Sequence, residues 1–155
     1  MAVTFLKAKT PFVLIDGVLE FLYVENKGAA FGILYGRQYL FVALAAAVSL
    51  FLFAYFLRMP CSKRLLPFRV ILICITAGAL GNCIDRLRLG YVIDFIYFMP
   101  IDFPVFNFAD ILVTCSAFMM VVLLVFVYRE EELSGMPLLG GGDAAGAPED
   151  GDDAD

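Results

Sequence analysis

Three long apolar segments stand out in the pattern of hydrophobic and polar positions along the chain. Residues 38–57 and 111–128 contain no charged side chain. Each is close to the roughly 20 residues that an α-helix needs to cross the ~30 Å hydrocarbon core of a bilayer. The middle segment, residues 70–84, is shorter and reaches that length only with its neighbours on both sides. The pattern therefore predicts three membrane helices, at about 38–58, 66–87 and 108–128.

The middle segment also carries two small residues four positions apart, Ala77 and Gly81. Small residues at this spacing let the backbones of two membrane helices approach closely. We therefore expect this face of the middle helix to pack against a neighbouring helix.

Residues 11–37, which precede the first apolar segment, have a different pattern. Two short strand-like runs, 12–15 and 18–24, are separated by Asp16-Gly17, a dipeptide typical of tight turns between strands. Four charged residues interrupt the apolar positions and exclude a membrane span: Asp16, Glu20, Glu25 and Lys27. We predict a small β element in this region, lying at the membrane surface.

The composition supports a membrane protein with an acidic extension. The 155 residues are 62% hydrophobic and only 17% charged, whereas soluble domains are about 45–50% apolar and about 25% charged. The net charge of −5 conceals a division, because residues 129–155 alone carry a net −8. Such a segment buries too little apolar surface to fold. We expect a single membrane domain over residues 1–128 and a disordered tail over 129–155.

The residue types that are present exclude several kinds of chemistry. The chain has no histidine, which excludes a Ser-His-Asp triad and any His-ligated metal site. Its four cysteines form no C-x-x-C motif, which argues against a thiolate zinc site. We expect no metal, no cofactor and no nucleic-acid partner. Carboxylate, lysine, serine and thiol chemistry remain.

Two aspartates beside the second and third predicted helices are the strongest candidates for such chemistry. Asp94 lies in an apolar stretch, where an unpaired carboxylate is costly; its structural alternative is a surface aspartate on a strand. Asp110 is at the third helical position after Asn107, a good N-cap, so its structural alternative is a capping carboxylate. The second helix ends and the third begins at one membrane surface, so the two carboxyls can meet there. Two close carboxyls share a proton, and one then acts as general base on water while the other polarises a carbonyl.

Further polar residues accompany this pair. Asn82, Asp85 and Arg86 follow i, i+3, i+4 spacing and therefore share one helical face. An ordinary helix end with a snorkelling arginine is the structural alternative. Asn26 precedes a run of small residues that, taken alone, is typical of a turn.

Taken together, these residues resemble one family closely, the lipoprotein signal peptidases (signal peptidase II), which are integral aspartic proteases of bacterial inner membranes. Three motifs match in order: Asn26-x-Gly28-Ala29-Ala30-Phe31-Gly32, Gly81-Asn82-x-x-Asp85-Arg86-x-x-x-Gly90-x-Val92-x-Asp94-Phe95 and Phe106-Asn107-x-Ala109-Asp110. Each motif is weak or moderate alone, but the ordered set is highly specific. The resemblance implies that the chain removes signal peptides from prolipoproteins by cutting just before a lipid-modified cysteine.

The resemblance also implies roles for individual residues. It makes Asp94 and Asp110 the catalytic pair and gives Asn26 a substrate contact in the surface loop. The supporting polar residues near the pair are then Asn82, Asp85, Arg86 and Asn107. Asp102 matches no motif, and we expect it to be a surface residue.

Location, partners and fold class follow from the same resemblance. The family's active site faces the outer side of the bacterial inner membrane, which places residues 58–69 and the tail in the cytoplasm and residues 1–37 and 85–106 outside. The implied partners are diacylglyceryl-modified prolipoproteins and membrane lipids, and we expect a monomer. The fold class is an all-α membrane protein with a small extracytoplasmic β element. The family has four membrane helices and this sequence supplies three, so we expect the first helix of the family to be missing here.

Functions of other classes use some of the same residues. A proton or ion pathway would also employ Asp85, Asp94 and Asp110, but with charges along the depth of the membrane rather than near one rim. A non-enzymatic scaffold would explain the apolar helices but not the polar cluster. A serine–lysine peptidase would depend on Ser62-Lys63, which lies in the basic loop that we expect to be cytoplasmic.

Overall fold

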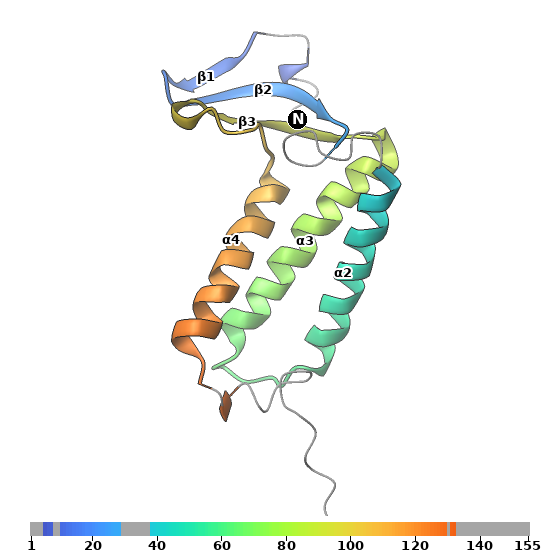
Figure 1. The fold of residues 1–155 in the computed structure, drawn as a ribbon, viewed down its shortest axis with the longest axis vertical. Helices are drawn as coiled ribbons and strands as arrows, with labels where there is room; N and C mark the ends of the chain where they lie inside the picture. Colours follow the sequence, from blue (N-terminus) through green and yellow to red (C-terminus); the bar gives the residue numbers. More distant parts are fainter. Residues whose placement is uncertain (1–4, 8–9, 29–37, 130, 133–155) are drawn as a thin grey trace, which may run out of the picture.

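The computed structural model describes residues 5–7, 10–28, 38–129 and 131–132, and it places a small sheet across one end of a helical bundle (Figure 1). In chain order the elements are β1 (Phe12–Ile15), β2 (Leu19–Asn26), α2 (Gln38–Arg58), α3 (Leu66–Leu89), β3 (Val92–Phe98), the 3-10 turn η2 (Met99–Ile101), α4 (Phe108–Val122) and the π-helical turn η3 (Leu123–Val127). Parts of two predicted regions, residues 29–37 and 133–155, lie outside the described residues.

Three of the described helices are long and apolar enough to cross a membrane. They are Tyr39–Arg58, Leu66–Leu89 and the continuous stretch Phe108–Val127, in which η3 extends α4. The three spans predicted from the apolar pattern are therefore confirmed, as is the fold class of a helical membrane protein with a small sheet. The middle helix continues slightly beyond its predicted end and stops at Gly90, whose φ of 80° is left-handed and suits a glycine.

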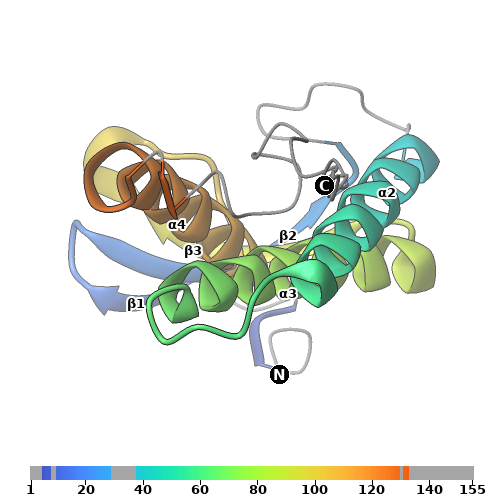
Figure 2. The same cartoon turned by 90° about the horizontal axis from the view of Figure 1, so that it is seen from below.

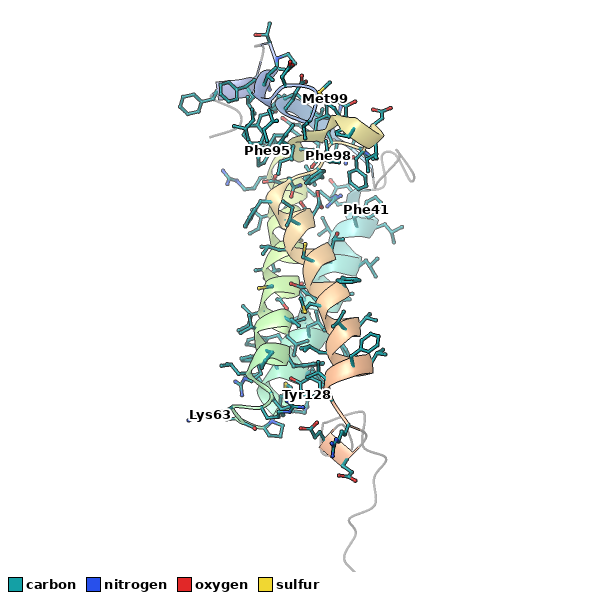
Figure 3. All side chains as sticks on the ribbon, turned by 90° about the vertical axis from the view of Figure 1, so that its left-hand side faces the viewer. Phe41, Lys63, Phe95, Phe98, Met99 and Tyr128 are labelled. Atoms are coloured by element: carbon teal, nitrogen blue, oxygen red, sulfur yellow. The ribbon has the colours of Figure 1, made fainter. Side chains whose placement is uncertain are left out.

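Helix α3 is the central helix of the bundle. It packs against both α2 and α4, and the view along the bundle shows it between them (Figure 2). The main apolar core lies at the end of the bundle away from the sheet. Its buried members are Tyr55, Met59, Leu65, Phe68, Ile71, Leu72, Leu123 and Tyr128. Tyr128 and Lys63 mark that end in Figure 3, opposite Phe95, Phe98 and Met99.

Helix α3 lies very close to α4 at Gly78. A Cβ atom on Gly78 would lie 2.6 Å from the carbonyl oxygen of Ala109 and 2.8 Å from a methyl group of Val113. At Gly81 the corresponding distance, to the Ala109 Cβ, is an ordinary 3.4 Å. The predicted packing of small residues is thus found one position away from the expected Ala77, which faces the side of α2.

The sheet is antiparallel with strand order β1-β2-β3. The two predicted strands form β1 and β2, and Gly17 takes the left-handed conformation (φ 69°) in the turn between them. The sequence pattern did not predict that Val92–Phe98 completes the sheet. This third strand pairs with β2, so that Val24 lies opposite Asp94 and Asn26 opposite Val92. The pairing brings the end of β2 to the start of β3, directly above the end of α3.

Gly78 and Gly81 offer a matched test of the α3–α4 contact. We expect Gly78→Ala to lower the free energy of unfolding by about 1–3 kcal/mol, because the added methyl group collides with backbone as well as side-chain atoms. Gly81→Ala should leave it nearly unchanged, because its methyl group has room. Thermal unfolding in detergent micelles measures both variants. Equal stability of the two would contradict this packing.

Candidate active site

Polar side chains from four elements converge where the sheet meets the bundle. Asp94 comes from β3, and Asn107 and Asp110 come from the start of α4; α3 and β2 add Asn82, Arg86 and Asn26. Asp94 and Asn107 are almost completely buried, with 2% and 5% of their surfaces exposed. Buried polar groups are tolerated only when they are hydrogen-bonded. The bonds in this cluster therefore determine its geometry.

Asp110 and Asn107 form a capping box at the start of α4. The Oδ1 atom of Asn107 accepts the backbone N–H groups of Ala109 (2.7 Å) and Asp110 (3.1 Å), and Oδ2 of Asp110 accepts the backbone N–H of Asn107 (3.0 Å). The capping interpretation of Asp110 is therefore confirmed. It accounts for one carboxylate oxygen, and Oδ1 remains for another partner.

The side-chain amide of Asn107 connects the two aspartates. Its Nδ2 atom donates to Asp94 Oδ1 at 2.8 Å and to Asn82 Oδ1 at 3.0 Å. The Nδ2 atom of Asn82 in turn donates to Asp110 Oδ1 at 2.7 Å. The two carboxyls are thus linked through the side chains of Asn107 and Asn82.

Asn26 completes the set of partners of Asp94. Its Nδ2 atom donates to Asp94 Oδ2 at 2.8 Å, while its own Oδ1 accepts the backbone N–H of Gly28 at 3.0 Å. Each of the four carboxylate oxygens of Asp94 and Asp110 therefore accepts an N–H group. Because N–H donors favour the charged form of a carboxyl, the site is built to hold negative charge.

The surroundings of Asp94 nevertheless raise the pKa of its carboxyl. Burial raises the pKa of the Asp94 carboxyl, and the negative charge of Asp110 raises it further. The hydrogen bonds from Asn26 and Asn107 and the positive charge of Arg86 lower it, but the net shift is upward. Asp94 therefore keeps its proton to a higher pH than an exposed aspartate does.

Arg86 joins three elements around the pair. Its guanidinium donates to the carbonyl oxygens of Gly28 (3.2 Å) and Asn82 (3.4 Å) and lies 5.0 Å from the ring centre of Phe41 on α2. The position of Phe41 near the sheet end of α2 is seen in Figure 3. Sequence reasoning did not single out Phe41, because an aromatic residue at the start of an apolar helix has no distinguishing spacing.

Asp85 is hydrogen-bonded to the backbone rather than to the other predicted side chains. Its Oδ2 atom accepts the backbone N–H of Ile93 at 3.4 Å, so it supports the turn from α3 into β3. It does not line the cavity beside the pair. Asp102 is exposed, as expected, and accepts a hydrogen bond from the hydroxyl of Tyr97 at 2.6 Å.

A cavity of about 860 Å³ opens beside the two aspartates. Asn26, Asn82 and Arg86 add to its polar lining. The remaining wall is mostly apolar, and on α4 it includes Ile111, Thr114 and Cys115. These three residues follow Asp110 at helical spacing, so the cavity continues from the carboxyls along the membrane-spanning part of α4. Among the described residues, no group of three or more His, Cys, Asp and Glu side chains could hold a metal ion.

Comparison with known proteins identifies the family. The family model described as signal peptidase (SPase) II matches residues 1–126. The chain belongs to the signal peptidase II family. It is 38% identical over 128 residues to the lipoprotein signal peptidase of Halothermothrix orenii, covering 83% of each protein. It is 45% identical over 120 residues to that of Symbiobacterium thermophilum, covering 76% of this chain and 77% of the relative.

Solved structures agree with this assignment. A bacterial membrane enzyme determined at 2.3 Å resolution superimposes with a TM-score of 0.70 and 32% identity, over 79% of this chain and 76% of that one. A second structure, at 1.9 Å, gives a TM-score of 0.69 and covers 81% of both chains. The protein is therefore a membrane peptidase of lipoprotein processing, and its family acts in removing signal peptides from prolipoproteins.

The apolar wall of the cavity was not predicted, although Ile111, Thr114 and Cys115 repeat at helical spacing after Asp110. Cys115 offers a direct test of this wall. We expect a small membrane-permeable maleimide to inactivate the enzyme, because an adduct on Cys115 would fill the cavity below the pair. The Cys115→Ala variant should cleave prolipoprotein as fast after exposure to the reagent as before it.

Cys61 supplies the control for that test, because it is exposed but lies between α2 and α3 at the opposite end of the bundle. The Cys61→Ala variant should remain as sensitive as the unaltered enzyme. If the reagent inactivated Cys115→Ala as fast as it inactivates the unaltered enzyme, the cavity wall would be wrongly placed.

Proposed function

We propose that this peptidase cleaves with an aspartate pair, Asp94 and Asp110, before the lipid-modified cysteine of a prolipoprotein. One observation supports the proposal above the others: two carboxyls, linked through the amides of Asn107 and Asn82, lie at the polar end of a cavity that continues along a membrane-spanning helix. Paired carboxyls that share one proton provide a general base and a general acid together.

The proposed reaction uses water as the nucleophile. The ionised carboxyl takes a proton from water as the water oxygen bonds to the scissile carbonyl carbon, and the protonated carboxyl gives its proton to the carbonyl oxygen. The first carboxyl then passes its proton to the amide nitrogen as the carbon–nitrogen bond breaks, and the second recovers a proton from a hydroxyl of the intermediate. The pair returns to its starting state, and every proton is supplied by water or the two side chains.

The two walls of the cavity suit the two parts of the substrate. Asn26 and Arg86, at the polar end, offer an amide and a guanidinium to the peptide backbone around the cleaved bond. The apolar wall formed by Ile111, Thr114 and Cys115 suits the apolar signal segment and the acyl chains of a diacylglyceryl group, which remain in the membrane. All of these side chains come from one chain, which supports a monomeric enzyme.

The proposed location is the bacterial inner membrane, with the site on its outer side. Lys63 lies at the end of the bundle opposite the sheet (Figure 3). The resemblance to the family, whose active site faces the outer side, supports this orientation; the count of basic residues does not decide it, because residues 1–37 and 85–106 carry six and residues 58–69 and 129 carry five. Arg64 pairs with Glu132 at that same end, with Nε and Oε1 2.8 Å apart. We therefore propose that residues 129–155 form a cytoplasmic tail following one membrane domain.

An ion pathway is a weaker alternative. It requires charged groups along the depth of the membrane. Asp85, Asp94 and Asp110 instead lie together at the sheet end of the bundle, where α3 ends and α4 begins.

Replacing each aspartate by asparagine tests the catalytic pair. We expect Asp94→Asn and Asp110→Asn each to reduce the rate of prolipoprotein cleavage by a factor of roughly 10³ or more, because an amide cannot accept a proton from water or deliver one. The matched control is Asp102→Asn, which changes an exposed aspartate outside the cavity and should leave the rate within about twofold. Rates are compared at equal amounts of folded enzyme in detergent.

The Asp110 variant separates catalysis from capping. Asparagine can still accept a backbone N–H group at the start of α4, so a capping role alone would leave cleavage near normal. Substantial activity in Asp110→Asn, or equal damage from Asp102→Asn, would refute the proposed pair.

The proposed orientation is tested with one native and one introduced cysteine. In intact cells, an impermeant thiol reagent should label Lys27→Cys, at the end of β2, and should not label Cys61 in the basic loop. Both sites should react after the membrane is permeabilised. Labelling of Cys61 but not position 27 from outside would reverse the orientation.

A further inference from the structure

We infer that Asn107 is a positioning residue that gives the two aspartates fixed and unequal roles, with the resting proton on Asp94 and the negative charge on Asp110. The inference rests on the proposed catalytic pair. It adds which carboxyl carries the proton before the reaction, which is ionised, and which residue maintains this difference. It follows from three features of the site: the orientation of the amides, the burial of the two carboxyls and the position of Asp110 on α4.

The backbone determines which way the amide of Asn107 points. Its oxygen accepts two N–H groups from the first turn of α4, at 2.7 and 3.1 Å. Its nitrogen must therefore face Asp94 and Asn82, and both of its hydrogens are used there, at 2.8 and 3.0 Å. If the oxygen and nitrogen of Asn107 changed places, its NH₂ group would face two backbone N–H donors, and its oxygen would face the acceptor oxygens of Asp94 and Asn82. The orientation therefore cannot reverse.

The orientation of Asn107 sets that of Asn82. Because Asn82 Oδ1 accepts from Asn107, its nitrogen faces Asp110 Oδ1 at 2.7 Å. Asp110 also receives the backbone N–H of Asn107 at 3.0 Å. Asn107 therefore supports the charge on Asp110 twice, directly through its main chain and indirectly through Asn82.

The two carboxyls differ in their surroundings. Asp110 lies in the first turn of α4, where the unpaired N–H groups and the helix dipole favour a negative charge, and it is partly exposed to the cavity. Asp94 lies on a strand, has 2% of its surface exposed and receives only neutral side-chain amides. A single proton is therefore held more stably by Asp94, where burial penalises the charge.

Charged groups on the neighbouring elements agree with this arrangement. Asp110 from α4 and Arg86 from α3 act on Asp94 in opposite directions. At the end of β2, Glu25 and Lys27 line the same cavity with opposite charges, and Asp85 of α3 is directed to the backbone of Ile93. With burial added, the net effect is a raised pKa of Asp94.

In the resulting reaction, Asp110 removes the proton from water and Asp94 protonates the carbonyl oxygen as the carbon–oxygen bond forms. Asp110 then protonates the leaving nitrogen, and Asp94 takes a proton from the intermediate as the carbonyl re-forms. Each carboxyl thus acts once as base and once as acid, and the turnover ends with the proton again on Asp94 and the charge on Asp110. No oxidant, reductant or further reactant is needed.

Infrared spectroscopy of the full chain in detergent tests where the proton rests. The carbonyl stretch of a protonated carboxylic acid should persist above the pH at which exposed carboxyls, with an ordinary pKa of about 4, are ionised. Asp94→Asn should lose this band, and Asp102→Asn should keep it unchanged. Asp110→Asn should retain it but lose it at a lower pH than the unaltered enzyme, because the charge that raises the Asp94 pKa is gone.

If the carboxylic acid band disappeared in Asp110→Asn and persisted in Asp94→Asn, the resting proton would be on Asp110 instead of Asp94. Loss in both variants, or no such band in the unaltered enzyme, would overturn the assignment. These spectra need no catalytic activity. Failure of the proposed function, seen as cleavage by the asparagine variants, is therefore distinguishable from failure of this inference.

Asn107→Ser tests the positioning role. Serine is also a good N-cap, so α4 keeps its start while both side-chain N–H donors are lost. Losing the N–H donor from Asn107 raises the pKa of the Asp94 carboxyl, so the basic limb of the pH–rate profile, which reports Asp94, should move to higher pH. We expect kcat to fall at least roughly tenfold with little change in Tm.

Asn107→Ala, which removes the cap as well, supplies the comparison and should also lower Tm. A purely structural role for Asn107 predicts the contrary pattern for the serine variant: an unmoved pH profile with a change in Tm alone. That result would overturn the inference.

Discussion

The start of α4 is the constraint on which the rest of the site depends. The first N–H groups of a helix have no partner within it and must find one elsewhere. Here Asn107 and Asp110 satisfy them in a capping box, and the same two side chains hold the polar cluster together. Because the oxygen of Asn107 is committed to the backbone of α4, its nitrogen must face Asp94. A requirement of helix formation therefore sets the direction of the hydrogen bonds in the candidate active site.

This arrangement works only if α3 and α4 keep a fixed separation. Asn82 lies on α3 and reaches Asp110 on α4 at 2.7 Å, a distance that a small shift of either helix would lengthen beyond a hydrogen bond. Gly78, one helical turn from Asn82, brings the backbone of α3 against Ala109, the residue before Asp110. In a membrane, where helices gain little from apolar burial against each other, such close contacts determine their separation. The glycine contact and the carboxyl pair are thus parts of one geometry.

Much of the fold and part of the site could be predicted from the sequence. The three spans follow from uninterrupted apolar length, and β1 and β2 follow from two short runs around Asp16-Gly17; these are local signals. The third strand could not be found in this way, because Val92–Phe98 is defined by its pairing with a strand far away in the chain. Asp85 shows the same limit. Its helical spacing predicted a face shared with Asn82 and Arg86, but it could not show that the carboxylate accepts the backbone N–H of Ile93, because that partner lies beyond the turn after α3.

Under the proposed function, the position of the pair at the ends of the membrane-spanning helices suits a lipid-bearing substrate. A carboxyl deep within the hydrocarbon would be very costly to ionise, and one in open water would not hold its proton near neutral pH. Asp94 and Asp110 lie where the spanning helices meet the sheet, so N–H donors can surround them while α4 carries the cavity into the membrane. A peptide bond beside a lipid-modified residue is confined to this same boundary, because its acyl chains stay in the hydrocarbon and its polar part does not. In the proposed reaction, this boundary is therefore the place where one site can reach the bond and still keep one carboxyl charged and the other neutral.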